Sequence, residues 1–287
     1  MRLNRRWRRP AREMGGFWSP APVFIAGPCV LEDEALNLEI AHRLSDLSVK
    51  LDLRVVYKAS FIKANRSTPD APRGPGLERG LAALVQVRED TGLPILTDVH
   101  ESEQVERVAL VADAIQIPAF LCRQTDLLEA AGRSGRPVNI KRGQWMSPEA
   151  MAGAVDKVRG AGSKDVIVTE RGTFFGYGDL VVDMRSFARI RSAAGCPVFY
   201  DATHSLQQPG AAVDGTSGGL REHVPALAYA AAAAGADGFF IETHVRPDAA
   251  PSDGATMWPL DRIQELVERA RLVWQTARAE AVECSSL

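Results

Sequence analysis

Cysteine is scarce in this sequence, and no two cysteines lie close together. The four that occur are Cys29, Cys122, Cys196 and Cys284, so no Cys-x-x-Cys pair exists among the 287 residues. Lack of such pairs argues against a zinc ribbon, and spacings this wide argue against a disulfide framework. We therefore expect a protein of a reducing compartment, the cytoplasm.

Long apolar runs are also missing. The longest, residues 224–241, is rich in Ala and is interrupted by Gly235 and Asp237, which predicts a helix followed by a strand and no membrane association. The Arg-rich N-terminus is not followed by the apolar region and small-residue cleavage site of a secretory signal. A transit peptide, a disordered extension and a start codon placed too far upstream are the three interpretations of this terminus.

Neither sign of charge dominates, because 34 Lys and Arg stand against 36 Asp and Glu, for a formal charge of −2. Residues 1–13 nevertheless contain six Arg and one Glu, a charge of +5, which leaves −7 for the rest. A mildly acidic body argues against non-specific binding of nucleic acid. We expect residues 1–20 to form a basic, disordered extension and residues 21–283 to form one catalytic domain.

Phosphate-binding glycine loops of the common kinds are absent. No Walker A sequence occurs, which excludes ATP chemistry of that type. The glycines of residues 74–80 have one residue too many for the dinucleotide fingerprint and do not directly follow an apolar run. We therefore expect no nucleotide cofactor.

Eight short apolar runs are present instead, and helical patterns separate them. The runs lie at 23–30, 54–61, 94–100, 114–120, 137–143, 166–172, 197–204 and 235–244. Apolar residues at helical spacing mark segments that include 35–53, 77–89, 103–111, 148–161 and 260–283. Eight strand–helix units predict a single-domain (β/α)8 barrel, with its active site at the carboxyl ends of the strands. The alternative, a doubly wound open sheet, would normally carry a Gly-rich loop after its first strand.

Polar side chains stand where these apolar runs stop. The first run ends in a thiol, and every later run ends in ionisable or amide groups. Because the carboxyl ends of barrel strands converge on one face, we expect these side chains to share one cavity. The strand-end residues are Cys29; Lys58, Lys63, Asn65 and Arg66; Asp98 and His100; Gln116; Lys141 and Arg142; Glu170 and Arg171; Asp201 and His204; and Glu242 and His244.

Five of these residues are cations, which phosphate or carboxylate oxygens satisfy best. They are Lys58, Lys63, Arg66, Lys141 and Arg171. Two phosphate-sized anions, or a phosphate and a carboxylate, would neutralise them. The structural alternative is that they form buried salt bridges with Asp98, Glu170, Asp201 and Glu242.

Four other residues together suggest a metal site. Cys29, His204, Glu242 and Asp253 follow the first, seventh and eighth runs, which are neighbours in a closed barrel. Thiolate, imidazole and carboxylate are ligands for divalent transition metals. Each has a simpler interpretation when taken alone, since Cys29 could be a buried apolar residue and Glu242 could pair with a cation.

At these positions the sequence resembles the 3-deoxy-D-manno-octulosonate 8-phosphate synthase family, over residues 23–275. The sister DAHP synthases normally have Lys-Pro-Arg-Thr where this chain has Lys63-Ala64-Asn65-Arg66, which argues against them. The matching motifs are Ala26-Gly27-Pro28-Cys29, Tyr57-Lys58-Ala59-Ser60-Phe61, Lys63-Ala64-Asn65-Arg66-Ser67, Asp98-Val99-His100-Glu101, the run from Gln116 to Leu128, Asn139-Ile140-Lys141, Thr169-Glu170-Arg171-Gly172-Thr173, Asp201-Ala202-Thr203-His204-Ser205 and Ser252-Asp253-Gly254.

The resemblance implies condensation of phosphoenolpyruvate with arabinose 5-phosphate and water. The products would be the eight-carbon sugar acid phosphate, a precursor of lipopolysaccharide, and inorganic phosphate. By the same resemblance, the residues that would hold phosphoenolpyruvate are Lys58, Lys63, Gln116, Ala119 through its backbone, Lys141 and Arg171. Those that would hold arabinose 5-phosphate are Asn65, Arg66, Ser67 and Asp98.

The resemblance also implies a metal and an oligomer. Metal-dependent members have Cys after Gly-Pro, as at Cys29, and lack the Cys that metal-independent members usually have at the position of Ser252. The implied ligands are Cys29, His204, Glu242 and Asp253, for one divalent ion that could be Zn, Fe or Mn. Family members are homotetramers, so we expect a homotetramer here.

For catalysis we single out Lys63 together with the metal ligands Cys29, His204 and Asp253. Lys63 is our candidate proton donor to the sugar aldehyde, because a Lys among other cations should have a lowered pKa. Departures from the family pattern at Ile62, at residues 67–72 and at residues 245–246 leave the preferred sugar open. The alternatives are a DAHP-type or sialic-acid-type synthase with another acceptor, and a phospho-sugar-binding barrel without catalysis.

Overall fold

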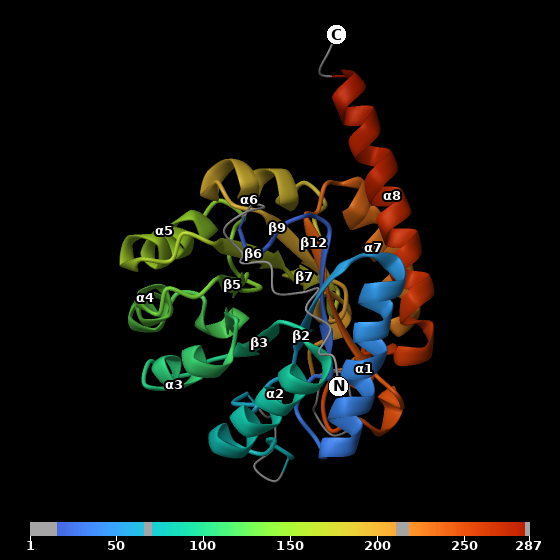
Figure 1. Ribbon diagram of the computed structural model, residues 1–287. Helices are drawn as coiled ribbons and strands as arrows, with labels where there is room; N and C mark the ends of the chain where they lie inside the picture. Colours follow the sequence, from blue (N-terminus) through green and yellow to red (C-terminus); the bar gives the residue numbers. More distant parts are fainter. Residues whose placement is uncertain (1–15, 66–70, 211–217, 285–287) are drawn as a thin grey trace.

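Eight parallel strands form the centre of the protein in the computed structural model, which describes residues 16–65, 71–210 and 218–284 (Figure 1). β1 pairs with β2 on one side and with β12 on the other, so the sheet closes on itself. The predicted barrel is confirmed. Its strands are β1 (Val23–Gly27), β2 (Arg54–Lys58), β3 (Ile95–Asp98), β4 (Ala114–Ile117), β5 (Val138–Lys141), β6 (Val166–Glu170), β9 (Val198–Asp201) and β12 (Gly238–His244).

α-Helices surround the barrel as an outer ring, and α8 extends past the rest of the molecule at the top of Figure 1. Each helix turns its apolar stripe toward the strands; α1, for example, buries Ile40, Leu44 and Leu47. Asp33 caps this helix by accepting a hydrogen bond from the backbone N–H of Leu36 at 3.0 Å. The helices are α1 (Glu34–Leu51), α2 (Leu77–Thr91), α3 (Gln104–Val111), α4 (Thr125–Arg133), α5 (Met151–Ala161), α6 (Ser186–Ala194), α7 (Val224–Ala233) and α8 (Ile263–Cys284).

Short extra strands build up the rim after three of the barrel strands. A hairpin of β7 (Thr173–Gly176) and β8 (Asp179–Val181) follows β6, and β10 (Gln207–Gln208) pairs with β11 (Gly218–Gly219) after β9. β13 (Trp258–Pro259) lies beside the end of β12. These elements lengthen the loops that follow β6, β9 and β12, where the functional residues of a barrel lie.

Two apolar cores result from the alternation of side chains along each strand. The outer core lies between the strands and the helices. The inner core fills the barrel and includes Phe17 and Trp18, which precede β1. Its other members are Val23, Ile25, Val56, Leu96, Ala114, Ile167, Phe199 and Phe240.

Phe17 and Trp18 close the end of the barrel at which the strands begin. Trp18 meets Phe199 edge to face with ring centroids 5.8 Å apart, and its indole N–H donates to the carbonyl of Asp165 at 3.3 Å. The backbone N–H of Phe17 donates to the Asp165 carboxylate. The prediction that residues 1–20 lie outside the fold is therefore wrong for residues 16–20. Residues 1–15 lie outside the described residues.

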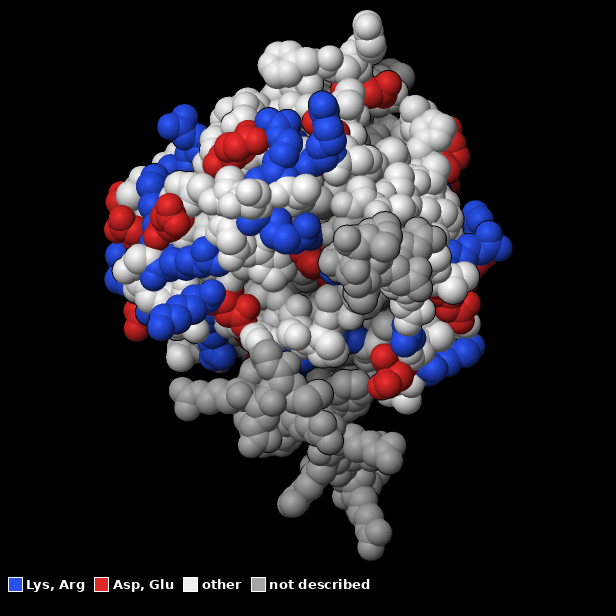
Figure 2. Space-filling view, turned by 90° about the horizontal axis from the view of Figure 1, so that it is seen from above, with Lys and Arg blue, Asp and Glu red and all other residues white. Residues whose placement is uncertain are grey.

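On the face of the molecule drawn in Figure 2, basic and acidic side chains are intermixed. Among the described residues, no helix has both the length and the apolar character needed to cross a membrane.

Trp18→Ala should destabilise the protein by about 3–5 kcal/mol, because it leaves a cavity at the closed end of the barrel. Urea unfolding monitored by circular dichroism measures this loss. Leu110→Ala is the control, since Leu110 is 77% exposed and its truncation should change stability by less than about 0.5 kcal/mol. Equal midpoints for the two variants would show that Trp18 contributes nothing to the barrel.

Candidate active site

A cavity of about 1190 Å³ opens at the carboxyl ends of the barrel strands. It exceeds the size that usually holds one small ligand, roughly 300–1,000 Å³, so it has room for two small substrates. Arg66 and Ser67, both predicted to bind the sugar phosphate, lie outside the described residues. The predicted site residues that line the cavity are Lys58, Lys63, Asn65, Asp98, Gln116, Ala119, Lys141, Arg171, His204 and Asp253.

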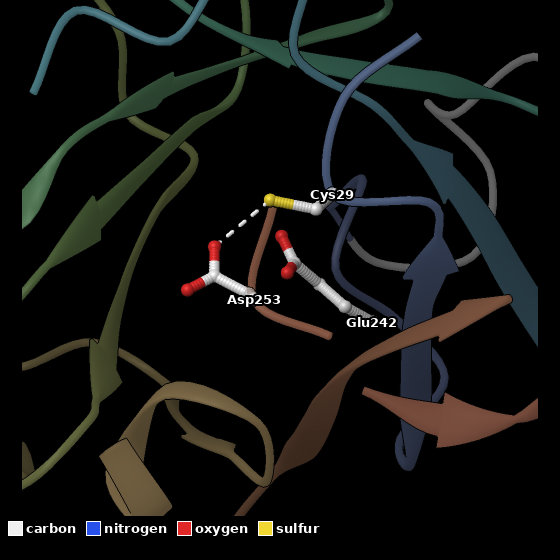
Figure 3. Close-up of side chains that lie close together, drawn as sticks. All are labelled: Cys29, Glu242 and Asp253. Carbon is white, nitrogen blue, oxygen red and sulfur yellow. Dashed lines mark hydrogen bonds between the residues drawn. The ribbon is translucent and has the colours of Figure 1, made fainter. Parts of the chain in front are cut away.

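Cys29, Glu242 and Asp253 point toward one another beside this cavity (Figure 3). One potential ligand atom from each lies within 4.8 Å of the other two. The Cys29 thiol donates to Asp253 Oδ2 at 3.0 Å, and Ser252 Oγ donates to the same oxygen at 3.0 Å. Three residues from distant parts of the chain therefore form one cluster, which we call the thiol–carboxylate cluster.

Local backbone geometry positions two members of this cluster, Cys29 and Asp253. Gly27 ends β1 so close to β2 that a Cβ atom there would lie 2.2 Å from the carbonyl oxygen of Lys58. Only glycine permits this approach, which carries the chain into Cys29. Asp253 has a left-handed backbone with φ of 52°, a conformation uncommon for residues other than Gly, Asn and Asp. The backbone thus fixes the direction of both side chains.

His204 lies at the edge of the thiol–carboxylate cluster, held by Asp201. Nδ1 of His204 is 2.8 Å from Asp201 Oδ2, and the backbone N–H of His204 donates to Asp201 Oδ1 at 2.8 Å. Because the ionised carboxylate only accepts, Nδ1 donates to it, and Nε2 is the ring nitrogen that faces the thiol–carboxylate cluster. Nε2 lies 3.5 Å from Glu242 Oε2 and 4.0 Å from Asp253 Oδ2. Three of the four predicted ligands therefore form one group, and His204 approaches two of them without belonging to it.

The chemistry of this cluster fits a divalent metal ion. Glu242 Oε2 is buried without a hydrogen-bond partner among the described residues, and a second carboxylate lies beside it. Burial and the negative charges of Asp253 and Glu242 raise the pKa of the Cys29 thiol well above its usual value. A bound cation would reverse that effect and satisfy the orphaned oxygen. Soft sulfur with imidazole and carboxylate suits a transition metal better than Mg²⁺ or Ca²⁺.

The cations divide into paired and unpaired groups, so the salt-bridge alternative holds for only some of them. Lys58 Nζ lies 3.3 Å from Glu242, and Lys141 Nζ lies 2.5 Å from Asp201. Within residues 16–65, 71–210 and 218–284, no carboxylate oxygen lies within 4.0 Å of the charged nitrogens of Lys63 or Arg171. Arg171 Nη1 is also buried without a partner among these residues. These two cations are the ones left to hold an anion.

Lys141 is the cavity lysine whose pKa is lowered. Its ammonium lies 3.0 Å from the centroid of the Phe240 ring, at the top of the inner core. Burial lowers the pKa of Lys141 to about 8, although Asp201 opposes the shift. Its charge therefore changes within a physiological range of pH.

The expectation of a lowered pKa at Lys63 is wrong. Burial alone would lower this pKa, but the acidic groups of Cys29, Glu242 and Asp98 raise it above the usual value of lysine. Lys63 faces more negative than positive charge, and its Nζ is 3.0 Å from Ser60 Oγ. Lys63 is consequently a lasting positive charge and not a group tuned to release a proton near neutral pH.

Hydrogen bonds from strand interiors orient two further cavity residues. Thr169 Oγ1 donates to Asn139 Oδ1 at 2.6 Å, and Asn139 Nδ2 donates to Gln116 Oε1 at 3.0 Å. Gln116 is thereby held by its amide oxygen, and its amide nitrogen has no hydrogen-bond partner among the described residues. Asp98 keeps a lowered pKa because Lys58 and His100 outweigh its burial, and its Oδ1 is a buried acceptor without a described partner. Such an acceptor suits a sugar hydroxyl.

Two residues that organise the site, Asn139 and Gln207, were given no role from the sequence, and Asp201 was considered only as a strand-end residue and a salt-bridge partner. Gln207 bridges Arg171 and Asp253 with contacts of 2.5 and 2.6 Å. For Asn139, the sequence offered one sign of a role in the site, which is a polar residue within an otherwise apolar run. Gln207 had no such indication, because its partners come from two other loops.

Comparison with known proteins shows close relatives along most of the chain. A sequence model of the DAHP synthetase I family matches residues 19–280. The 2-dehydro-3-deoxyphosphooctonate aldolase of Syntrophotalea carbinolica is 56% identical over 247 residues, which are 86% of this chain and 88% of that protein. The proteins of the same name from Nitratidesulfovibrio vulgaris strain DP4 and Nitrosococcus oceani are 52% and 49% identical, over 87% and 91% of this chain and 91% and 92% of theirs.

Anion binding in the cavity should weaken as the pH rises through about 8, because Lys141 loses its charge there. Sulfate is a suitable probe, since it keeps its own charge throughout this range. Between about pH 7 and about pH 9 we expect its affinity, measured by calorimetry, to fall roughly tenfold. Lys141→Arg keeps its charge and should remove most of that fall. An equal fall in both proteins would assign it to another group.

Proposed function

Because the chain belongs to the DAHP synthetase I family and, within it, to the 2-dehydro-3-deoxyphosphooctonate aldolases, we infer that it makes the eight-carbon sugar acid phosphate that their name describes. The reaction condenses phosphoenolpyruvate with arabinose 5-phosphate and water, releases inorganic phosphate, and supplies lipopolysaccharide synthesis. The observation that carries this function is identity of 49–56% over nearly the full length of both chains. Identity with these relatives favours this reaction over the DAHP-type and sialic-acid-type alternatives, between which the family model alone does not decide.

For phosphoenolpyruvate we propose the cationic side of the cavity. Arg171 and Lys63 lack carboxylate partners among the described residues, and Lys141 adds a third charge. Phosphate and carboxylate oxygens match these donors. Lys58, Gln116 and the Ala119 backbone complete the predicted set around the same cavity.

For arabinose 5-phosphate we propose the adjoining part of the cavity, between the loops that follow β2 and β3. Asn65 and Asp98 line it, and Asp98 offers its unpartnered oxygen to a hydroxyl. Arg66 and Ser67, next along the chain, remain the predicted ligands of the sugar phosphate. Support for them is the Lys-Ala-Asn-Arg-Ser motif alone.

We propose that Cys29, His204, Glu242 and Asp253 hold one divalent metal ion. When bound, it would supply a Lewis acid and a template for an oxygen ligand. The donor set and the orphaned Glu242 oxygen support this assignment, and they leave Zn, Fe and Mn open. Asp201 would keep His204 in the tautomer that presents Nε2.

In the condensation, C3 of phosphoenolpyruvate bonds to the aldehyde carbon while water adds at C2. Negative charge develops on the former aldehyde oxygen, and Lys63 as an ammonium stabilises it until that oxygen takes up the proton that the attacking water gives off. Lys141 and Arg171 hold the phosphate, whose C–O bond breaks when inorganic phosphate leaves. The raised pKa of Lys63 therefore favours an electrostatic role over the proton-donor role that we first expected.

We also propose a homotetramer in the cytoplasm. Large aromatic side chains stand exposed at two places. The rings of Phe120 and Trp145 stack with centroids 5.9 Å apart, and Phe175 and Tyr177 lie in the β7–β8 hairpin. Neighbouring copies would cover these rings. Sedimentation of the full chain measures the state, and a monomer would overturn the proposal. The free thiols of Cys29, Cys122 and Cys196 agree with a reducing compartment.

The function predicts phosphate release from phosphoenolpyruvate only with a matching aldose phosphate. In a panel of arabinose 5-phosphate, erythrose 4-phosphate and N-acetylmannosamine, we expect turnover with the first. Phosphate release is measured colorimetrically, and the product by mass spectrometry. Turnover only with one of the other two sugars would overturn the assignment.

Removal of metal with a chelator should lower activity at least about tenfold, and addition of one divalent ion should restore it. Cys29→Ala should retain little metal by mass spectrometry, because it removes a ligand. Cys196→Ala is the matched control, since Cys196 is a buried cysteine outside the thiol–carboxylate cluster and should bind metal normally. Full activity of the stripped protein would overturn the metal assignment.

A further inference from the structure

Gln207 connects the cationic side of the cavity with the thiol–carboxylate cluster. It opens β10, directly after the turn that carries His204. Arg171 Nη2 donates to Gln207 Oε1 at 2.5 Å, and Gln207 Nε2 donates to Asp253 Oδ1 at 2.6 Å. The two contacts form one continuous chain of hydrogen bonds from an anion-binding cation to a metal ligand.

The chemistry of the partners fixes the orientation of this amide. Arginine can only donate and an ionised carboxylate can only accept, so the amide oxygen must face Arg171 and the nitrogen must face Asp253. No other orientation of Gln207 satisfies both neighbours.

Each end of this series of hydrogen bonds meets one of the two proposed ligand sites. The guanidinium of Arg171 is a rigid plane, and its Nη1 is buried without a partner among the described residues while Nη2 holds Gln207. An anion on Nη1 therefore also fixes the direction of Nη2. At the other end, Gln207 holds Oδ1 of Asp253, which sets the rotation that turns Oδ2 toward Cys29.

We propose that Gln207 is a positioning residue that couples anion binding at Arg171 to metal affinity at Cys29, Glu242 and Asp253. The inference rests on the proposed phosphoenolpyruvate and metal sites and adds a connection between them. Phosphoenolpyruvate orders Arg171, Arg171 orders the amide, and the amide orders a metal ligand. By thermodynamic linkage the metal strengthens phosphoenolpyruvate binding by the same factor.

Charge attraction across the cavity would also link an anion with a metal, but it does not depend on the amide. Truncation of Gln207 leaves every charged group in place and removes only the hydrogen-bonded connection. The part of the coupling that is lost on truncation is therefore the part that Gln207 carries.

The experiment is a Co²⁺ titration of the metal-free protein, followed by the absorption of the Cys29 thiolate–cobalt bond. Titrations with and without saturating phosphoenolpyruvate give two dissociation constants, and no turnover occurs without the sugar. In the unaltered protein we expect phosphoenolpyruvate to tighten Co²⁺ binding about fivefold or more. Gln207→Ala should bring this ratio close to the value that charge attraction alone produces, at least about threefold lower.

Gln208→Ala is the matched control, because Gln208 neighbours Gln207 in β10 but donates to Asp179 on the exposed hairpin, at 2.6 Å. It should keep the full ratio. The same ratio in Gln207→Ala as in the unaltered protein would overturn the inference while leaving the metal site intact. Absence of any cobalt–thiolate absorption would instead overturn the metal assignment, and the inference with it.

Discussion

Closure of the sheet between β1 and β12 is the constraint on which the site depends. Cys29 and Asp253 are 224 positions apart in the chain, yet their side chains share a hydrogen bond because the first and last strands are neighbours. Glu242 comes from β12 itself. An open sheet with the same strands would leave the thiol at one edge and the carboxylates at the other.

Within one cavity the protein keeps two environments of opposite charge. Acidic groups and a thiol gather at the β1–β12 junction, and cations face them from β2, β5 and the loop after β6. Asp201 and Gln207 lie between the two sides. Asp201 contacts Lys141 and His204, and Gln207 contacts Arg171 and Asp253. Lys58 joins the two sides directly, because its ammonium lies 3.3 Å from Glu242.

Strand ends were predictable from the sequence because apolar runs stop where polar groups begin, and closure then brings those groups together. The pKa of Lys63 was not predictable, since its direction depends on which carboxylates face the ammonium in space. Phe17 and Trp18 were missed because two aromatics in a short segment produce no periodic pattern. Gln207 was missed for a related reason: its partners belong to other loops, so no local spacing indicates its role.

Placement of the predicted metal ligands on the first and last strands has a consequence for the protein during its synthesis. A growing chain carries Cys29 from the outset but lacks Glu242 and Asp253 until nearly all of it has left the ribosome. A lone thiol binds metal weakly compared with a complete ligand set. At a metal site built from these ligands, the junction of β1 and β12 would delay capture of the ion until the barrel can close.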